Sequence, residues 1–224
     1  MMQSGACTAA FLGWLLLPSF AISGEARESK PKVDPQRTWG WYNAAEAHEN
    51  LLEKRRGDPR LVARYYRLAA ENGNVTAAYK LGEIYENGLG LPADPVQAFF
   101  WYMKAAAQNN KHGQLKVGWC YQKGIAVQAD PKIAAIWYQA AAENDNIWGY
   151  HMLAFLFADG EGVPQDAKLA RRYFEASLPK TRDHWAKWRL AQLIAAEDPK
   201  RAKSLLEEAA AAGNAQAAEE LKRF

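Results

Sequence analysis

The sequence predicts an all-α protein, built as a right-handed α-solenoid of about five helix-turn-helix repeats. The first observation behind this prediction is a motif that returns in tandem every 36 residues, as from Gly82 to Gly118. The second is that each copy holds two segments with the apolar period of an α-helix, separated by glycines. The third is composition, since 49% of the 224 residues are hydrophobic and 24% are charged, as in ordinary folded domains.

The first half of each repeat is a short apolar segment that ends in glycine. Its three clearest copies are Leu81–Gly88, Val117–Gly124 and Leu153–Gly160. Just before and within the first copy, Ala78, Leu81 and Tyr85 recur at the i, i+3 and i+7 spacing of one helix stripe. Gly88 follows the last apolar residue, where a left-handed glycine commonly ends a helix. The segment is therefore expected to be one helix.

The second half of each repeat begins with Asp94-Pro95 or its equivalent. An aspartate suits the N-cap of a helix and a proline suits its first turn. Ala98, Trp101 and Ala105 then fall on one stripe of the helix that follows. The pattern returns as Asp130-Pro131, Ala134, Trp137-Tyr138 and Ala141-Ala142, and more weakly as Asp166, Ala170 and Tyr173-Phe174. Each unit is thus predicted to hold two helices, with Trp101 and Trp137 in the core.

Degenerate copies extend the array in both directions. One contains Asp58-Pro59, although its own first helix, near residues 44–56, does not determine its register. Another contains Leu190-Ala191 and Asp198-Pro199. We expect a repeat domain over residues 39–224, with units near 42–75, 76–111, 112–147, 148–182 and 183–214 and a polar capping helix over 215–224.

Residues 1–23 have the pattern of a secretory signal peptide. They contain no charged side chain, and the apolar run 9–17 is followed by small residues at Ala21 and Ser23, as a signal peptidase requires. We expect cleavage near Ser23, a flexible leader over residues 24–38, and a periplasmic or secreted protein with no integral membrane association after cleavage. The alternative is an uncleaved membrane anchor, although the run is short for a spanning helix, which needs about 20 residues.

Composition and motifs argue against several functional classes. A formal net charge of +3 does not favour nucleic acid as a partner. Beyond the signal segment Cys120 is the single cysteine, so neither an internal disulfide nor a cysteine-rich zinc site is expected. No phosphate loop, serine elbow or zinc-protease motif occurs, and the four histidines have no ligand partner at i+3 or i+4. We expect no catalytic residue, no metal and no cofactor, hence a protein that is not an enzyme.

On these residues the chain resembles the Sel-one-like repeat family, a relative of the tetratricopeptide repeats. The family pattern, roughly A-x-x-L-G-x-x-Y-x-x-G-x-G-V-x-x-D-x-x-x-A-x-x-W-x-x-x-A-A, is met over residues 78–106 and, with departures, over 114–142 and 150–177. The resemblance covers roughly residues 42–224. It implies a protein-interaction scaffold or adaptor of the bacterial cell envelope, whose partner is an envelope protein or peptide. Relatives credited with enzymatic activity have paired cysteines, which this chain lacks.

In solenoids of this type the first helix of each pair lines a concave groove. The flank predicted to face it reads, unit by unit, Thr76, Tyr79 and Glu83, then His112, Leu115 and Trp119, then Trp148, His151 and Phe155. A solvent-facing flank is normally polar, whereas this one becomes more aromatic along the chain. Including the rim and the next unit, the predicted partner-binding residues are Tyr79, Glu83, Trp119, Lys123, Trp148, His151, Phe155, Asp159, Trp185 and Trp188.

Two interpretations of this aromatic row stay open. Trp and Tyr dominate binding hot spots, so the row suits a peptide or a partner helix lying in the groove. Its rings also suit stacking on the sugars of a cell-wall glycan or peptidoglycan, and the sequence does not separate the two ligands. The structural alternative is that the aromatic residues only pack the C-terminal repeats more tightly.

Overall fold

Eleven α-helices and no strand make up the residues that the computed structural model describes, 34–53 and 57–223. The predicted all-α repeat fold is confirmed. The predicted signal peptide, and the predicted leader as far as residue 33, lie outside the described residues. Among the described helices, none has the length and apolar character needed to cross a membrane.

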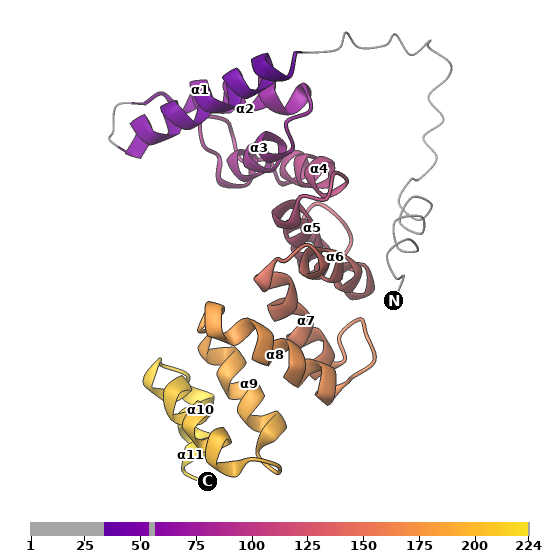
Figure 1. Ribbon diagram of the computed structural model, residues 1–224, viewed down its shortest axis with the longest axis vertical. Coiled ribbons are helices and arrows are strands. Elements are labelled where there is room, and N and C mark those ends of the chain that lie inside the picture. Colours follow the sequence, from indigo (N-terminus) through magenta and orange to yellow (C-terminus); the bar gives the residue numbers. More distant parts are fainter. Residues whose placement is uncertain (1–33, 54–56, 224) are drawn as a thin grey trace, which may run out of the picture. The chain divides into compact units, whose positions relative to one another are not determined.

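The helices form hairpins that follow one another in chain order, and each helix packs mainly on its neighbours in sequence (Figure 1). The hairpins are α1 (Pro35–Glu53) with α2 (Pro59–Glu71), α3 (Val75–Asn87) with α4 (Pro95–Ala106), α5 (Lys111–Lys123) with α6 (Pro131–Glu143), α7 (Ile147–Asp159) with α8 (Ala167–Thr181), and α9 (His184–Ile194) with α10 (Pro199–Ala211). The last helix is α11 (Ala215–Leu221). The odd-numbered members, α1 to α9, are the first helices of the units, and the even-numbered members are the second helices.

Local chemistry explains where these helices begin and end. The side chain of Asp94 accepts hydrogen bonds from the backbone N–H groups of Val96 and Gln97, both 3.0 Å long, while Pro95 occupies the first turn of α4. Gly88 ends α3, the first helix of this hairpin. It has a φ of 71°, and its N–H donates to the carbonyl of Ile84. The predicted aspartate caps and left-handed glycine ends are confirmed.

The turn between units combines a left-handed residue with an asparagine cap. Asn109 and Asp145 have φ values of 60° and 57°. After Asp145, the Oδ1 of Asn146 accepts the N–H of Trp148 at 3.0 Å, and its amide donates to the carbonyl of Lys111, 2.9 Å away in the preceding unit. An aspartate could cap the helix but could not donate that second bond.

The core is a column of large rings set against very small residues. Each of the first four units contributes one fully buried ring from its second helix, namely Tyr66, Tyr102, Tyr138 and Phe174. A Cβ atom added to Gly82 would lie 2.5 Å from the ring of Tyr102, and one added to Gly118 would lie 2.7 Å from that of Tyr138. The glycines therefore provide the space that the tyrosines fill. Trp101 and Trp137 are also buried, as predicted.

The first helix of the array begins earlier than expected. The sequence predicted a leader up to residue 38 and a helix from about residue 44, whereas α1 begins at Pro35. Asp34 caps it, with Oδ1 accepting the N–H of Gln36 at 2.9 Å. Trp41 and Tyr42 then pack against the core of the first unit. Asp34-Pro35 is the same helix-starting pair that opens most of the second helices, and residues 35–38 form the first turn of α1.

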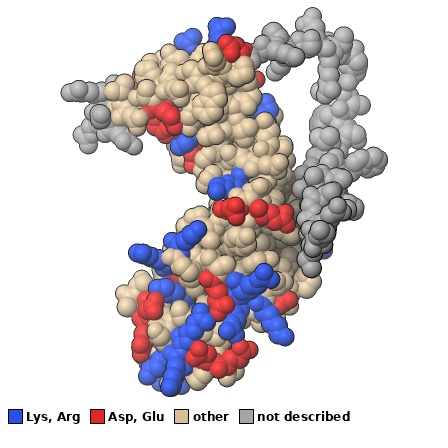
Figure 2. Space-filling model, in the orientation of Figure 1, with Lys and Arg blue, Asp and Glu red and all other residues tan. Residues whose placement is uncertain are grey.

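Charged side chains are unevenly distributed along the array. On the face that Figure 2 shows, Lys, Arg, Asp and Glu gather over the C-terminal units, whereas the N-terminal units are mostly uncharged. The small formal net charge of +3 thus conceals local surfaces of different character.

Candidate functional site

A repeated polar cluster sits between the hairpins at the N-terminal end of the array. The hydroxyl of Tyr102 donates to Glu86, and Lys116 of the next unit places its Nζ 2.6 Å from the same carboxylate. One repeat earlier the same roles are taken by Tyr66, Glu49 and Lys80. The cluster therefore links the first unit to the second, and the second to the third, through a buried tyrosine, a glutamate and a lysine.

The cluster loses its charges in the third repeat. Gln122 stands in the place of the glutamate and accepts the hydroxyl of Tyr138 at 2.8 Å, while Met152 stands in the place of the lysine. One unit further, Ala158 and Phe174 replace the polar pair, and both are buried. The two members of the ion pair thus change together from one repeat to the next. The result is a change from an ionic to an apolar surface at α5 and α7.

An apolar pocket of about 220 Å³ opens where this change occurs. Its walls come from α5, α6 and α7 and consist of Leu115, Lys116, Trp119, Tyr138, Trp148 and Met152. Trp119 is 38% exposed and Trp148 is 46% exposed, so both indoles are accessible at its edge. The hydroxyl of Tyr138 and the amine of Lys116 are already bonded to Gln122 and to Glu86, respectively. The pocket consequently offers an incoming group mainly apolar contacts.

The two predicted charged rim residues, Lys123 and Asp159, lie at the C-terminal ends of α5 and α7. The Nζ of Lys123 lies 5.0 Å from the ring centre of Trp119, a cation–π distance. Lys123 and Asp159 are both exposed, and Asp159 is paired with Arg189 of α9. Lys123 is therefore placed to act beside the pocket, whereas Asp159 also has a structural partner.

Two more predicted aromatic residues form a separate pair on α9. The rings of Trp185 and Trp188 meet edge to face with centroids 5.9 Å apart. Trp185 is 42% exposed. Trp188 is half-buried, and its Nε1–H donates to Glu220 of α11 at 2.7 Å. Trp188 thus helps to hold the terminal helix, and Trp185 is the accessible member of the pair.

Tyr79 and Glu83 belong to the ionic end of the predicted row and do not line the pocket. The hydroxyl of Tyr79 donates to Glu83 at 2.6 Å, and Glu83 also lies 3.6 Å from the amine of Lys80. Burial, followed by the bond to Glu83, raises the pKa of Tyr79 well above its usual range. The two side chains therefore satisfy each other.

His151 requires a correction, because it was predicted to face the groove. It is only 3% exposed, and its ring lies between those of Trp148 and Phe155, at centroid distances of 5.2 and 5.3 Å. Its Nε2 is 3.3 Å from Asp183, the residue that caps α9. Phe155 is half-buried and meets the ring of Phe174 edge to face. The start of α9 covers this turn of α7, a contact between units that helical phase alone does not reveal.

The surroundings of His151 do not form a nucleophilic site. Ser177 lies 3.5 Å from its Nδ1, but this serine is fully buried and its hydroxyl donates to the carbonyl of Phe174 at 3.3 Å. Cys120 is buried as well, and desolvation raises the pKa of its thiol to about 11, which leaves little reactive thiolate. Within the described residues no group of three or more His, Cys, Asp or Glu side chains is arranged to hold a metal ion.

We expect the buried imidazole to make stability depend on pH. Burial lowers the pKa of His151, and this effect outweighs the opposing effect of Asp183. The unfolded chain takes up this proton near pH 6.5. The contribution of the neutral His151 to the free energy of unfolding is therefore fully present above that pH and is lost as the pH falls through the lower pKa of the folded state. Urea melts at pH 7.5 and 5.0 should show a smaller loss of stability for His151→Gln than for the wild type. Equal losses in the two proteins would contradict this expectation.

Four pocket residues are not among the predicted binding residues, namely Leu115, Lys116, Tyr138 and Met152. A signal for them exists in the sequence, since Lys116 and Met152 are equivalent positions one repeat apart, as are Glu86 and Gln122. A lysine and its carboxylate partner vanish together there. That coupled change marks the place where the surface turns apolar.

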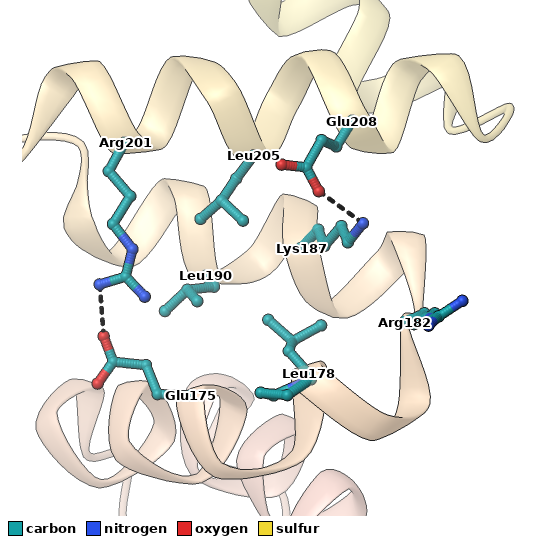
Figure 3. A pocket seen from close by; sticks show the side chains of 9 residues that line it. Glu175, Leu178, Arg182, Lys187, Leu190, Arg201, Leu205 and Glu208 are labelled. Carbon is teal, nitrogen blue, oxygen red and sulfur yellow. Dashed lines mark hydrogen bonds and ion pairs between the residues drawn. The ribbon is translucent and has the colours of Figure 1, made fainter.

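A second cavity, of about 340 Å³, lies between α8 and α10 above α9 (Figure 3). Its apolar walls are Leu178, Pro179, Leu190 and Leu205. Two ion pairs lie at the edges of this cavity. Arg201 of α10 bonds to Glu175 of α8 at 2.8 Å, and Lys187 of α9 bonds to Glu208 of α10 at 2.7 Å. Because these charges satisfy each other and Leu190 is almost fully buried, the cavity is a packing gap and a weaker candidate than the aromatic pocket.

Solved structures share this architecture. A protective antigen present in uropathogenic Escherichia coli strains, which displays an SLR fold, has a TM-score of 0.72 and 26% identity over 83% of this chain and 40% of its own. A Sel1 repeat protein from Oxalobacter formigenes has a TM-score of 0.63 and 28% identity over 75% of this chain and 50% of its own. A Sel1 repeat protein from Klebsiella pneumoniae, at 19% identity and a TM-score of 0.52 over 87% of this chain and 99% of its own, shows the fold alone.

The chain thus spans half or less of the length of the first two structures that it resembles. No curated protein matches it. The Sel1 repeat family model matches residues 42–74, 75–110, 111–146, 149–177 and 192–214. These matches cover more than half of the chain, and the chain therefore belongs to the Sel1 repeat family.

Proposed function

We propose that this protein is a non-enzymatic interaction scaffold of the bacterial cell envelope, which binds a peptide or a partner helix at the pocket between α5 and α7. Sel1 repeat proteins generally mediate protein–protein interaction. The observation that supports this particular site is the pocket of about 220 Å³, which has the accessible indoles of Trp119 and Trp148 at its edge. Export to the envelope is inferred from the pattern of residues 1–23.

The pocket has the features of a binding hot spot. Its centre is apolar, from Leu115 and Met152, and large aromatic side chains stand beside it. Binding energy at protein interfaces concentrates on such aromatic anchors, where an apolar side chain of the partner excludes water. Lys123 beside Trp119 can pair with an acidic residue of the partner. We infer that an apolar side chain of the partner enters the pocket and that an adjacent carboxylate meets Lys123.

The polar groups of the pocket favour a peptide over a glycan. A sugar offers many hydroxyl groups, which need hydrogen-bond partners in addition to an aromatic face. Here the amine of Lys116 and the hydroxyl of Tyr138 are taken by Glu86 and Gln122. The indole faces would stack on a sugar ring, but Lys116 and Tyr138 would have to be shared with their present partners, whereas an apolar side chain needs no hydrogen bond from the pocket. The glycan alternative therefore becomes an outcome of the experiment below.

The Trp119→Ala/Trp148→Ala double variant is expected to lose its protein partner while keeping its fold. Each hot-spot truncation costs about 2 kcal/mol or more, so the affinity for a purified partner should fall by at least about tenfold. Partners co-precipitated from envelope extracts would be identified with the wild type and then titrated with both proteins by calorimetry. Circular dichroism would establish that the variant remains helical.

Trp39→Ala is the matched control, because this indole is also exposed but lies on α1, away from the pocket. It should leave the affinity unchanged. Retention of every partner by a folded double variant would exclude the pocket as the binding site. If the double variant loses binding to purified peptidoglycan but keeps its protein partners, the ligand of the pocket is a glycan and not a peptide.

A further inference from the structure

The second helices carry their own exposed surface, distinct from the aromatic pocket. It consists of two equivalent positions in four successive units and of one further residue on α4. The two positions hold Arg60 and Arg64 on α2, Val96 and Phe100 on α4, Lys132 and Ile136 on α6, and Lys168 and Arg172 on α8, and the further residue is Lys104, one turn beyond Phe100. We call these nine residues the second-helix row. On each helix its members are four residues apart, so they share one face of that helix. Because the units are equivalent, the faces succeed one another along the array.

All nine side chains of the second-helix row are exposed, including its large apolar ones. Val96 is 60% exposed, and Phe100 and Ile136 are each 47% exposed. About half or more of the surface of each of these three side chains is therefore left open to solvent. Val96 and Phe100 lie one turn apart on the same face of α4, and exposed apolar groups that lie together on a surface commonly mark an interaction site.

The basic members of the row make no ion pair with another described residue, unlike many cations elsewhere in the chain. Ion pairs occupy Lys80, Lys116 and Lys187 on the first helices, for example. None of the six cations of the row is so paired, and the nine positions include no acidic residue. The amine of Lys104 instead lies 4.5 Å from the ring centre of Phe100. The positive charge of the row is thus available to an external anion.

We propose that the second-helix row binds an anionic lipid surface, so that the protein is attached peripherally to a membrane. Phosphate headgroups would pair with the six cations, while Phe100, Ile136 and Val96 enter the boundary between headgroups and acyl chains. Nucleic acid fits less well, because valine and isoleucine neither stack on bases nor bond to them. An acidic protein partner fits less well too, because it would need a continuous negative surface long enough to face four successive repeats.

This attachment is independent of the proposed partner site. The row lies on α2, α4, α6 and α8, whereas most of the aromatic pocket is formed by the first helices α5 and α7. A scaffold attached through its second helices would keep its first helices accessible to a partner. Failure of one proposal therefore leaves the other standing.

The test is flotation of the purified full chain with vesicles of phosphatidylcholine, with or without phosphatidylglycerol. We expect binding only when the anionic lipid is present, and a decrease as the salt concentration rises. The Lys132→Glu/Lys168→Glu/Arg172→Glu variant should bind anionic vesicles at least about tenfold less than the wild type. The Phe100→Ser/Ile136→Ser variant should bind less at equal charge, which distinguishes insertion from simple attraction. Circular dichroism checks that each variant is folded.

The matched control reverses three other exposed cations, as Lys180→Glu/Lys203→Glu/Arg223→Glu. These residues lie outside the row and make no ion pair with described residues, so net charge changes by the same amount. The control should keep wild-type binding. Any contribution from the apolar run 9–17 is common to all variants and to both vesicle types. Equal loss in the two charge-reversal variants, or equal binding of the wild type to both kinds of vesicle, would overturn the proposal.

Discussion

Replacing Trp137 by alanine is expected to lower the free energy of unfolding by about 3–5 kcal/mol. This indole is only 5% exposed and belongs to α6, in the middle of the array. Its removal leaves a cavity that the helices cannot close without losing contacts with the units on both sides. Because each unit is stabilised mainly by its neighbours, a weak central unit should also divide the array and broaden the unfolding transition.

Urea melts followed by circular dichroism measure this change. Ile136→Ala is the matched control, since the neighbouring residue on the same helix is 47% exposed. Its substitution should change stability by no more than about 0.5 kcal/mol. A loss below about 1 kcal/mol for Trp137→Ala would show that the indole is not part of the core.

Gly149→Ala is expected to destabilise the protein even though alanine is the better helix former. A Cβ atom at Gly149 would lie 2.6 Å from the backbone nitrogen of Ala142 and 2.9 Å from the backbone oxygen of Tyr138. Backbone atoms cannot rotate away, so α6 and α7 would have to separate. Overpacking of this kind costs about 1–3 kcal/mol or more, against a gain of about 1 kcal/mol from helix propensity. Because the clash is with backbone atoms, the upper end of that range applies, and we expect a net loss of about 2 kcal/mol.

The matched control for this substitution is Gly40→Ala. Gly40 also lies inside a helix, α1, but a Cβ atom there would meet no atom within 4 Å. This variant should gain up to about 1 kcal/mol from helix propensity. Thermal or urea unfolding in which Gly149→Ala is as stable as Gly40→Ala would show that α6 and α7 do not pack as closely as described. Because Trp148 precedes Gly149, separation of the helices should also enlarge the aromatic pocket.

Features governed by neighbours in sequence were predictable. Asp94-Pro95 starts a helix and Gly88 ends one, because each acts on backbone groups within a few residues of itself. The same rule applied to Asp34-Pro35 predicts the start of α1 correctly, whereas the repeat pattern alone leaves these residues in the leader. The burial of Trp137 followed from helical phase together with repetition, which shows which stripe faces the neighbouring units.

The candidate site was predictable only in part. Trp119, Trp148 and Trp185 are exposed, in agreement with the face assigned to them. His151 has the same helical phase as Tyr79 but is buried, because Asp183 at the start of α9 covers it. No residue near His151 in sequence signals that contact. Whether a partner binds the aromatic row stays a prediction.

By itself the sequence determined the paired helices of the central repeats, their caps, the number of repeats and the burial of Trp101 and Trp137, since these depend on short-range backbone chemistry and on a period of 36 residues. Only the tertiary structure decided which members of the aromatic row meet at one pocket and which are enclosed. It also showed that six cations of the second-helix row lie exposed without an ion pair to other described residues. The physical reason is that exposure depends on what the neighbouring unit places against a side chain, and those contacts join residues about 30 or more positions apart.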